Sequence, residues 1–258
     1  MINIKYISSI RSKKRKKTNS FIYEKIARII IDSIDLVKIK FDNILEIGIN
    51  EDTVFEYLNK KFNNSNFLRV DNNENKRSKA DRYNFLRQDI DEWRIKENTY
   101  DLIFSNCYSF ISNNLEDTLK NIKYSLKDDG FVILAIPENN NLYQLHNSMI
   151  KADLDLYNGV YQRVNPTYDI NYILSKLKKF QFKGSIINND KFTIEYNNFS
   201  KLLNDVRSMN LSYFHLDKKK FFEKKNYFDV VELNFKKDYF QNNIYPLEFS
   251  INIVSAWK

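Results

Sequence analysis

The chain has 258 residues, of which 43% are hydrophobic and 15% aromatic, so it can form one large α/β domain, or a domain with a small annex, around a sizeable core. No apolar run approaches the roughly 20 residues that cross a bilayer, so we predict no transmembrane segment. A single cysteine, Cys107, excludes an internal disulfide and fits a reducing compartment. The net charge of +8 leaves contact with nucleic acid or a membrane surface open.

Much of the positive charge lies near the start of the chain, in residues 11–17. This run is either a contact for nucleic acid or a membrane surface, or a solvated arm ahead of the fold. A mitochondrial presequence is a third interpretation, because the first 17 residues contain no acid. Few apolar residues are present there to form an amphipathic face, and no secretory signal is visible. We take 1–19 as a basic N-terminal arm.

Apolar residues recur with helical spacing over 20–39, where Ser20 would cap the helix. Short apolar runs and amphipathic segments then alternate. Strands are predicted over 43–48, 67–70, 85–88, 100–105 and 131–136, helices over 51–62 and 115–126, and a turn at Asp129-Gly130. Strands that alternate with helices indicate a parallel sheet covered by helices on both faces.

The remaining sequence predicts helices over 142–156, 170–180 and 199–209 and a long, charged helical stretch over 218–240. Paired strands are predicted over 182–187 and 192–196, and an edge strand over 249–257. These strands would complete the same sheet. We therefore expect a single domain over 1–258, with a cofactor-binding half at 20–137 and a substrate-side half at 138–258.

The first predicted strand ends in Glu46, Ile47 and Gly48. A glycine at this point lets the chain turn sharply and lets a ligand approach the backbone, and the following helix offers free N–H groups to an anion. An ordinary strand-to-helix turn is the alternative. The common pattern of acid-x-Gly-x-Gly-x-Gly has Asn50 and Asp52 at its later positions here. Asn50 tolerates the left-handed conformation, whereas Asp52 adds a negative charge where a ligand carboxylate would lie.

Two further acids follow predicted strands. Asp71 and Asn72 come directly after the second strand, where a carboxylate in nucleotide-binding sheets accepts hydrogen bonds from ribose hydroxyls. Asp89 follows the third strand and would accept from an adenine amino group, with Ile90 against the ring. A turn aspartate and a helix cap are the respective alternatives. Because the carboxyl ends of parallel strands meet at one edge, we expect Glu46, Asp71 and Asp89 to converge on one nucleoside.

Metal chemistry is not expected. His146 and His215 are the two histidines of the chain and lie far apart in sequence, so a two-His-one-carboxylate site would have to use both. Neither a nucleophile–base pair nor a general base is evident, and we assign no catalytic residue.

The order and spacing of the strands resemble the class I, S-adenosylmethionine-dependent methyltransferase fold, a Rossmann-like, mostly parallel sheet of seven strands with helices on both faces. Longer segments resemble the complex I assembly-factor branch of that fold, which includes an arginine hydroxylase, and its alphaproteobacterial methyltransferase relatives. These segments are 96–103, 126–130, 141–145, 190–196, 205–209 and 256–258, together with the basic run. A neighbouring branch methylates a malonyl carrier protein.

The resemblance implies S-adenosylmethionine as the cofactor. Its expected contacts are Glu46, Ile47, Gly48 and Asn50 at the amino acid end, Asp71 and Asn72 at the ribose, Asp89 and Ile90 at the adenine, and Ser105 and Asn106 after the fourth strand. Tyr143 and Arg163 are substrate-side candidates because they follow the fifth strand. A helix-packing tyrosine and a surface arginine are the alternatives for these two residues.

The sequence departs from the resembling families at several positions. The segment after the fourth strand has no proline, so methylation of a base amino group, which uses Asp/Asn-Pro-Pro-aromatic, is not expected. Cys107 also lacks the preceding proline of the cytosine-carbon enzymes. Phe110 and Ile111 stand where His-Trp is common, and Asn210 stands where a glycine follows the methionine. These changes leave open a protein that keeps the fold and has lost turnover.

Three functional hypotheses follow. The first is a methyltransferase that acts on a protein or carrier protein and is linked to respiratory complex I assembly. The second is a non-catalytic or arginine-hydroxylating assembly factor, and the third is a nucleic-acid-binding methyltransferase. We expect a protein substrate or assembly partner, no stable nucleic-acid complex, and a cytoplasmic location, or the mitochondrial matrix in a eukaryote. The oligomeric state and the methyl acceptor stay open.

Overall fold

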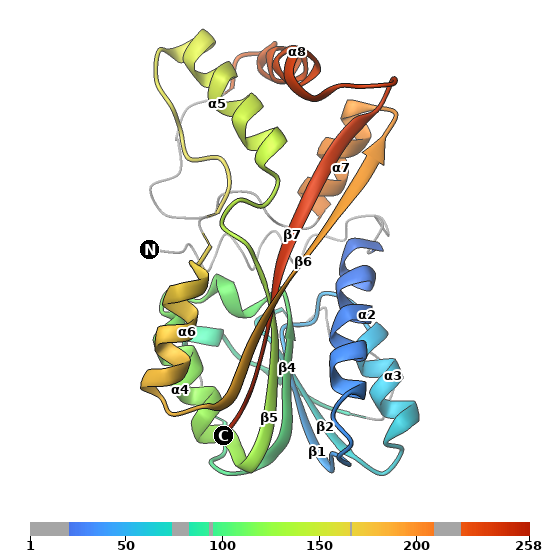
Figure 1. Ribbon diagram of the computed structural model, residues 1–258, viewed down its shortest axis with the longest axis vertical. Coiled ribbons are helices and arrows are strands. Elements are labelled where there is room, and N and C mark those ends of the chain that lie inside the picture. Colours follow the sequence, from blue (N-terminus) through green and yellow to red (C-terminus); the bar gives the residue numbers. More distant parts are fainter. Residues whose placement is uncertain (1–20, 74–82, 93–94, 166, 209–222) are drawn as a thin grey trace.

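Seven strands form a single sheet in the order β3-β2-β1-β4-β5-β7-β6 (Figure 1). The structure is a computed structural model that describes residues 21–73, 83–92, 95–165, 167–208 and 223–258. β1 to β5 pair in parallel, and β7 runs antiparallel between β5 and β6. The strands are β1 (Asn43–Ile47), β2 (Asn66–Asp71), β3 (Asn84–Arg87), β4 (Tyr100–Asn106), β5 (Leu126–Pro137), β6 (Lys183–Tyr196) and β7 (Tyr245–Trp257). This arrangement confirms the predicted α/β class and the mostly parallel, seven-stranded sheet.

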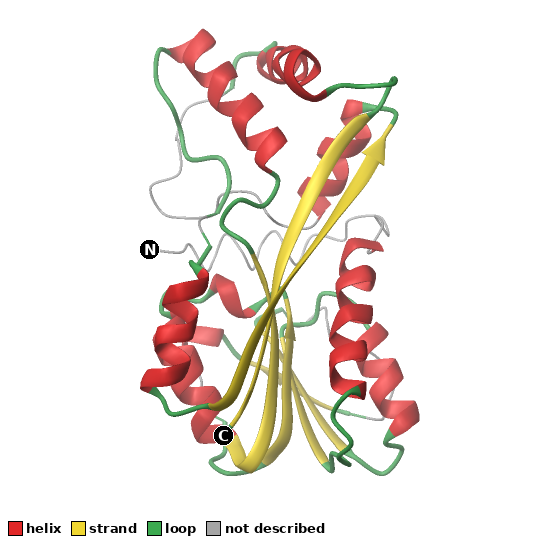
Figure 2. Ribbon diagram, viewed as in Figure 1, coloured by secondary structure: helices red, strands yellow, loops and turns green. Residues whose placement is uncertain are grey.

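Helices cover both faces of this sheet (Figure 2). α2 (Phe21–Asp35) and α3 (Thr53–Lys61) lie on one face, and α4 (Leu115–Ser125) and α6 (Ile170–Lys179) lie on the other. The core lies between these layers. The middle strands read as nearly continuous apolar runs because both of their faces are covered, and Leu102, Ile103 and Phe104 of β4 are fully buried.

Three more helices lie beyond the carboxyl ends of the parallel strands. They are α5 (Tyr143–Tyr157), α7 (Phe199–Ser208) and α8 (Tyr227–Tyr239), and they surround the upper halves of β6 and β7 (Figure 1). We call α5, α7 and α8, together with the halves of β6 and β7 that lie beside them, the annex. The short 3-10 helices η2 (Ile90–Glu92) and η3 (Ser109–Ile111) follow β3 and β4.

The predicted pair of strands at 182–187 and 192–196 is wrong. Residues 183–196 form one continuous strand, β6, which pairs with β7 along nearly its whole length. The polar triplet Asn188-Asn189-Asp190 suggests a turn, but the Asn189 amide donates to Ser250 Oγ at 3.1 Å and to Asn252 Oδ1 at 3.0 Å across the ladder. Cross-strand hydrogen bonds thus satisfy a side chain that in isolation favours a turn.

The predicted turn at Asp129-Gly130 is also wrong as a strand boundary. β5 begins at Leu126 and includes both residues, with a register shift against β4 and a positive φ of 60° at Asp129. β7 begins four residues before the predicted strand over 249–257, and it is not the predicted edge strand, because it pairs with β5 on one side and β6 on the other. The basic run 11–17, Ser20, Asn210 and His215 lie outside the described residues, as does the first part of the predicted helix over 218–240.

Within the described residues, none of the helices combines the length and apolar character needed to cross a membrane. The division of the chain into a cofactor-binding half and a substrate-side half stays a prediction.

Candidate functional site

The candidate site lies at the carboxyl edge of the sheet, between β1 and β4. From β1 the chain proceeds outward through β2 to β3, and from β4 it proceeds in the opposite direction to β5. The connections behind β1 and β4 therefore leave the sheet in opposite directions. In open α/β sheets such a switch point leaves a crevice beyond the strand ends, where ligands bind.

The turn behind β1 depends on a glycine. Gly48 has a φ of 76°, which favours glycine, and its N–H donates to Val70 O at 2.7 Å. A Cβ added at Gly48 would lie 1.9 Å from Cγ of Tyr108, so the Tyr108 ring packs directly on the turn. Gly48 is thus required both by its backbone conformation and by the side chain that covers it.

Asp71 at the end of β2 holds the same turn. Its Oδ2 accepts from the Ile49 N–H at 2.8 Å, and its Oδ1 accepts from the Asn73 N–H at 2.9 Å. The residue is fully buried. The carboxylate therefore fixes the glycine turn against β2, and its predicted contact with ribose stays a prediction.

Asn72 and Asp89 meet beside Asp71. Burial raises the pKa of Asp89, and the nearby Asn72 side chain works in the opposite direction. The Asp91 N–H donates to Asp89 Oδ1 at 3.0 Å, and Ile90 is buried. The predicted ribose and adenine residues are therefore neighbours at one edge of the sheet.

Amide side chains join β1 to β4. Asn50 Nδ2 donates to the backbone oxygens of Asn106 at 2.6 Å and of Cys107 at 3.3 Å. Asn106 Nδ2 donates to Glu51 Oε1 at 3.1 Å and to Tyr23 O at 3.0 Å. These contacts place Asn50 and Asn106, both predicted cofactor contacts, side by side at the switch point.

Ser105 and Ile47 support the same region from within the sheet. Ser105 Oγ donates to Ile47 O at 2.8 Å and accepts from the Ser109 N–H at 3.2 Å. All three residues are buried. The hydroxyl of Ser105 thus shapes the loop behind β4, and its predicted contact with a cofactor stays a prediction.

Glu46 does not join the other two acids. Its Oε2 lies 2.5 Å from Nε of Arg69, and Arg69 Nη1 lies 2.7 Å from Asp52 Oδ1. Only 2% of the Glu46 side chain and 1% of the Arg69 side chain are exposed. Burial raises the pKa of Glu46, and the attraction of Arg69 works in the opposite direction. Glu46 is therefore engaged in a buried ion pair, and the expected convergence of the three carboxylates on one nucleoside stays a prediction.

Several polar side-chain atoms are buried near this edge of the sheet. Within the described residues no hydrogen-bond partner exists for Asn72 Oδ1, Gln88 Oε1, Asn106 Oδ1 and Ser109 Oγ. Buried polar atoms are normally paired with protein or water, so unpartnered atoms behind three strands of one edge indicate places where another group could supply donors. Their positions at the ends of β2, β3 and β4 fit a nucleoside and the group attached to it.

Tyr143 and Arg163, the predicted substrate-side residues, lie in or beside the annex. They do not contribute to the group of buried polar atoms at the switch point. Tyr143 begins α5 and packs edge-on against Tyr239 of α8, with ring centres 5.9 Å apart. Arg163 pairs with buried Asp153 and lies 2.5 Å from Glu223 Oε1. The structure thus gives both side chains packing roles, and their contact with a substrate stays a prediction.

Cys107 is buried, and burial raises the pKa of its thiol. Such a thiol is a poor nucleophile, because the thiolate is the reactive form. In the part of the chain that the structure describes, no group of three His, Cys, Asp or Glu side chains could hold a metal ion.

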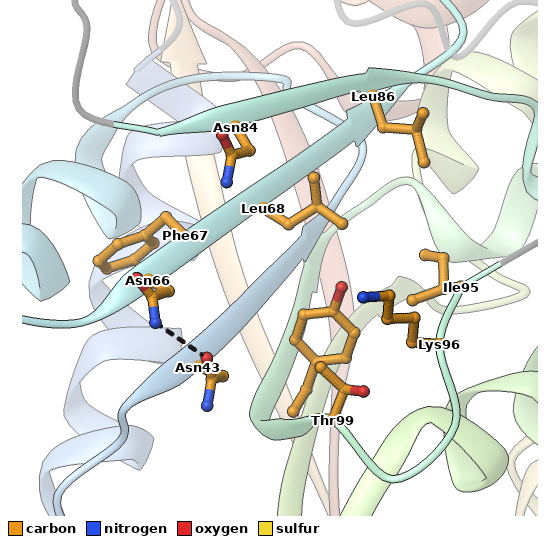
Figure 3. Close-up of a pocket in the computed structure, with 10 residues that line it drawn as sticks. Asn43, Asn66, Phe67, Leu68, Asn84, Leu86, Ile95, Lys96 and Thr99 are labelled. Carbon is orange, nitrogen blue, oxygen red and sulfur yellow. Dashed lines mark hydrogen bonds between the residues drawn. The ribbon is translucent and has the colours of Figure 1, made fainter.

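A separate pocket of about 400 Å³ lies at the opposite, amino edge of the sheet (Figure 3). Asn43, Asn66 and Asn84 begin β1, β2 and β3 there, and Asn66 Nδ2 donates to Asn43 Oδ1 at 3.2 Å. Leu68 and Leu86 form part of its lining. This pocket shares no residue with the switch point and is therefore not the predicted cofactor site.

Sequence reasoning missed three residues that shape the site: Arg69, Tyr108 and Glu51. Arg69 carried a usable signal, because it is a charged residue inside the apolar strand of 66–71 and pairs in register with Glu46. Tyr108 and Glu51 lie in connections whose paths follow from the packing of the sheet, and local sequence gives no signal for them.

Comparison with known proteins agrees with this architecture. A family model for a methyltransferase domain matches residues 45–134, which span β1 to most of β5. The human protein named arginine-hydroxylase NDUFAF5, mitochondrial, is 25% identical over 193 residues, which is 73% of this chain and 56% of that protein. A malonyl-[acyl-carrier protein] O-methyltransferase of Bacillus cereus is 31% identical over 115 residues, 42% of each chain. The chain thus spans little more than half the length of the human relative.

Solved structures share the fold at low sequence identity. A putative methyltransferase from Bacillus halodurans superposes with a TM-score of 0.58 at 11% identity, over 91% of this chain and 99% of that one. Phosphoethanolamine N-methyltransferase 2 of Haemonchus contortus, solved with S-adenosylhomocysteine, gives a TM-score of 0.55 at 16% identity, over 97% of this chain and 60% of that one. The matched domain, the strand order and these neighbours together place the chain in the class I fold of the S-adenosylmethionine-dependent methyltransferases.

Proposed function

We propose that the protein binds S-adenosylmethionine at the carboxyl edge of β1, β2 and β4 and transfers its methyl group to a protein or carrier-protein substrate. The observation that carries this proposal is the position of two buried amide oxygens that have no hydrogen-bond partner within the described residues. Asn72 Oδ1 and Asn106 Oδ1 lie on opposite sides of the Gly48 turn, at the topological switch point where sheets of this type bind nucleotides.

In this proposal, different residues contact different parts of the cofactor. Asp71 holds the Gly48 turn in place, Asn72 and Asp89 face the nucleoside, and buried Ile90 offers an apolar surface to the adenine ring. Asn106 and Asn50 hold the opposite side of the crevice. When bound, the cofactor supplies a methyl group activated by a sulfonium, so the protein contributes position and polarity.

The annex favours a large methyl acceptor. α5, α7 and α8 lie beyond the same edge of the sheet (Figure 1), and β6 and β7 carry their upper halves into the annex. Relatives named for a carrier-protein substrate and for arginine hydroxylation support a protein acceptor. A cytoplasmic or matrix location and a role in complex I assembly belong to this proposal. The word mitochondrial in the names of the relatives supports a matrix location.

Transfer of a labelled methyl group tests the proposal. The full chain is incubated with methyl-labelled S-adenosylmethionine and candidate proteins, including acyl carrier protein and complex I subunits. The variant Asp89→Asn should lose most of the transfer, while Asp42→Asn, an exposed aspartate at the amino edge, serves as the control for the same chemical change. A substrate labelled equally by both variants would contradict the assignment of the carboxyl edge.

An arginine-hydroxylating assembly factor is the second candidate. Five of the curated relatives carry the name arginine-hydroxylase NDUFAF5. Mass spectrometry of a substrate incubated with S-adenosylmethionine, dioxygen and a two-electron reductant separates the two candidates. Methylation adds a methyl group, whereas hydroxylation inserts one oxygen atom of O₂ and reduces the other to water. The third hypothesis, a nucleic-acid-binding methyltransferase, is supported by the net charge of +8 alone. Its affinity for RNA or DNA should fall steeply as the salt concentration rises.

A further inference from the structure

The pairing of Glu46 with Arg69 leaves the amino acid end of the cofactor without its expected acid. Glu46 is the carboxylate that the sequence assigns to this end, yet its charge is neutralised inside the sheet by Arg69. Asp52, another acid behind β1, pairs with the same guanidinium. A cationic ligand group at the switch point therefore needs another carboxylate.

Glu51 supplies this carboxylate. Its Oε1 accepts from Asn106 Nδ2 at 3.1 Å, and its Oε2 accepts from the Thr53 N–H at the start of α3. It thus stands between the turn behind β1 and the end of β4, at the switch point itself. Each of its oxygens keeps a second lone pair for another donor.

The charge of Glu51 is not balanced by the described part of the protein. Arg69 approaches the backbone oxygen of Glu51 at 3.4 Å, but its charged contacts go to Glu46 and Asp52. No lysine or arginine among the described residues forms an ion pair with the Glu51 carboxylate. Burial raises the pKa of Glu51, as expected for a partly desolvated carboxylate that lacks a cation.

An independent observation points to a donor-rich ligand at the same place. Asn106 is 99% buried, since only 1% of it is exposed, and its Oδ1 has no hydrogen-bond partner within the described residues. The other atom of this amide, Nδ2, is the one that donates to Glu51. The carboxylate of Glu51 and the unpartnered amide oxygen of Asn106 lie on neighbouring side chains, and together they form a pair of acceptors suited to an ammonium group.

We propose that Glu51, with Oδ1 of Asn106, binds the ammonium group at the amino acid end of S-adenosylmethionine. The inference rests on the proposed function and deepens it. An ammonium group has three donors and no acceptor, which matches two adjacent acceptors of which one is charged. In this chain Glu46, the acid before the glycine turn, therefore has a structural role, and Glu51, five residues later, recognises the ligand.

Calorimetry with three nucleosides tests the role of Glu51. S-adenosylmethionine carries both the ammonium and the carboxylate, decarboxylated S-adenosylmethionine keeps the ammonium, and 5′-methylthioadenosine has neither. The variant Glu51→Gln should weaken the first two ligands about tenfold or more, as for the loss of a charged hydrogen bond, and 5′-methylthioadenosine less than about twofold. Glu56→Gln, an exposed residue of α3, is the matched control and should change none of the three affinities.

Other outcomes overturn the inference. Equal losses for all three ligands would show that Glu51 only maintains the fold of the turn, and a melting curve of the variant would reveal the same effect. Stronger binding of S-adenosylmethionine by Glu51→Gln, with decarboxylated S-adenosylmethionine unchanged, would mean that Glu51 occupies the place of the ligand carboxylate. If the unaltered protein binds none of the three nucleosides, the proposed function fails together with this inference.

Discussion

Glu46 of β1 and Arg69 of β2 form a buried ion pair, with 2.5 Å between Oε2 and Nε. The two residues are register partners on neighbouring parallel strands, so their side chains emerge from the same face of the sheet. Phe55 of α3 covers the guanidinium at 4.4 Å, measured from Cζ to the ring centre. The pair therefore ties the first two strands to the helix that begins at the candidate site.

Replacing Arg69 should destabilise the protein strongly. Arg69→Met leaves the Glu46 carboxylate buried without its cation, and breaking a buried pair in this way costs about 3–5 kcal/mol. Urea unfolding measures the loss. The double variant Glu46→Leu/Arg69→Met should recover most of it, because apolar residues of similar size replace buried pairs well. A double variant no more stable than Arg69→Met would contradict this account of the pair.

Gly48→Ala should also destabilise the protein, by about 2 kcal/mol or more, because a positive φ is costly for alanine. The new Cβ would in addition overlap the Tyr108 ring. Gly159→Ala is the matched control, since the nearest atom to a Cβ there is 3.9 Å away. Thermal unfolding of the two variants should separate them clearly. Equal melting temperatures would show that Tyr108 does not pack on the turn.

The reactivity of the Cys107 thiol measures whether the loop behind β4 stays closed to solvent. The thiol is buried and burial raises its pKa, so it should react with an alkylating reagent at neutral pH far more slowly in the folded protein than in urea. Mass spectrometry of the alkylated chain over time gives both rates. Fast labelling of the native protein would mean that the loop of Asn106 and Tyr108 opens to solvent.

Glu116 of α4 should give stability that depends on acid pH. Hydrogen bonds from Lys176 and Lys179 of α6 lower the pKa of Glu116 to about 2 from an ordinary value of 4.5. A carboxylate whose pKa is lower in the folded state stabilises the protein above its unfolded pKa. The excess stability over Glu116→Gln should thus be complete above about pH 4.5 and vanish as the pH falls towards about 2. In a Lys176→Met/Lys179→Met background the same substitution should leave no such pH dependence.

The parallel half of the fold could be predicted from sequence because its strands are buried on both faces. The apolar runs that become β1, β2 and β4 end at Gly48, Asp71 and Asn106, and strand ends of one direction share an edge. Asp71 and Asp89 accordingly lie at the ends of two paired strands, with Asn72 near Asp89, and their contact with a nucleoside stays a prediction.

The remainder could not be predicted because it depends on pairing between distant segments. A charged residue inside an apolar strand marks Arg69 as unusual, but only the register of β1 against β2 decides that Glu46 is its partner, and the local sequence does not fix that register. The polar triplet of β6 becomes a strand only because β7 lies beside it. The role of Glu51 follows from the path of a connection, which the strand pattern leaves free.

A crystal structure of the full chain with S-adenosylhomocysteine tests the central claim most directly. We predict that the adenosine lies beyond the carboxyl ends of β1 and β2, with Asn72 and Asp89 at the nucleoside and Asn106 at the amino acid end. A protein that fails to bind this ligand, or that holds it elsewhere, for example in the amino-edge pocket beside Asn43 and Asn66, would contradict the account.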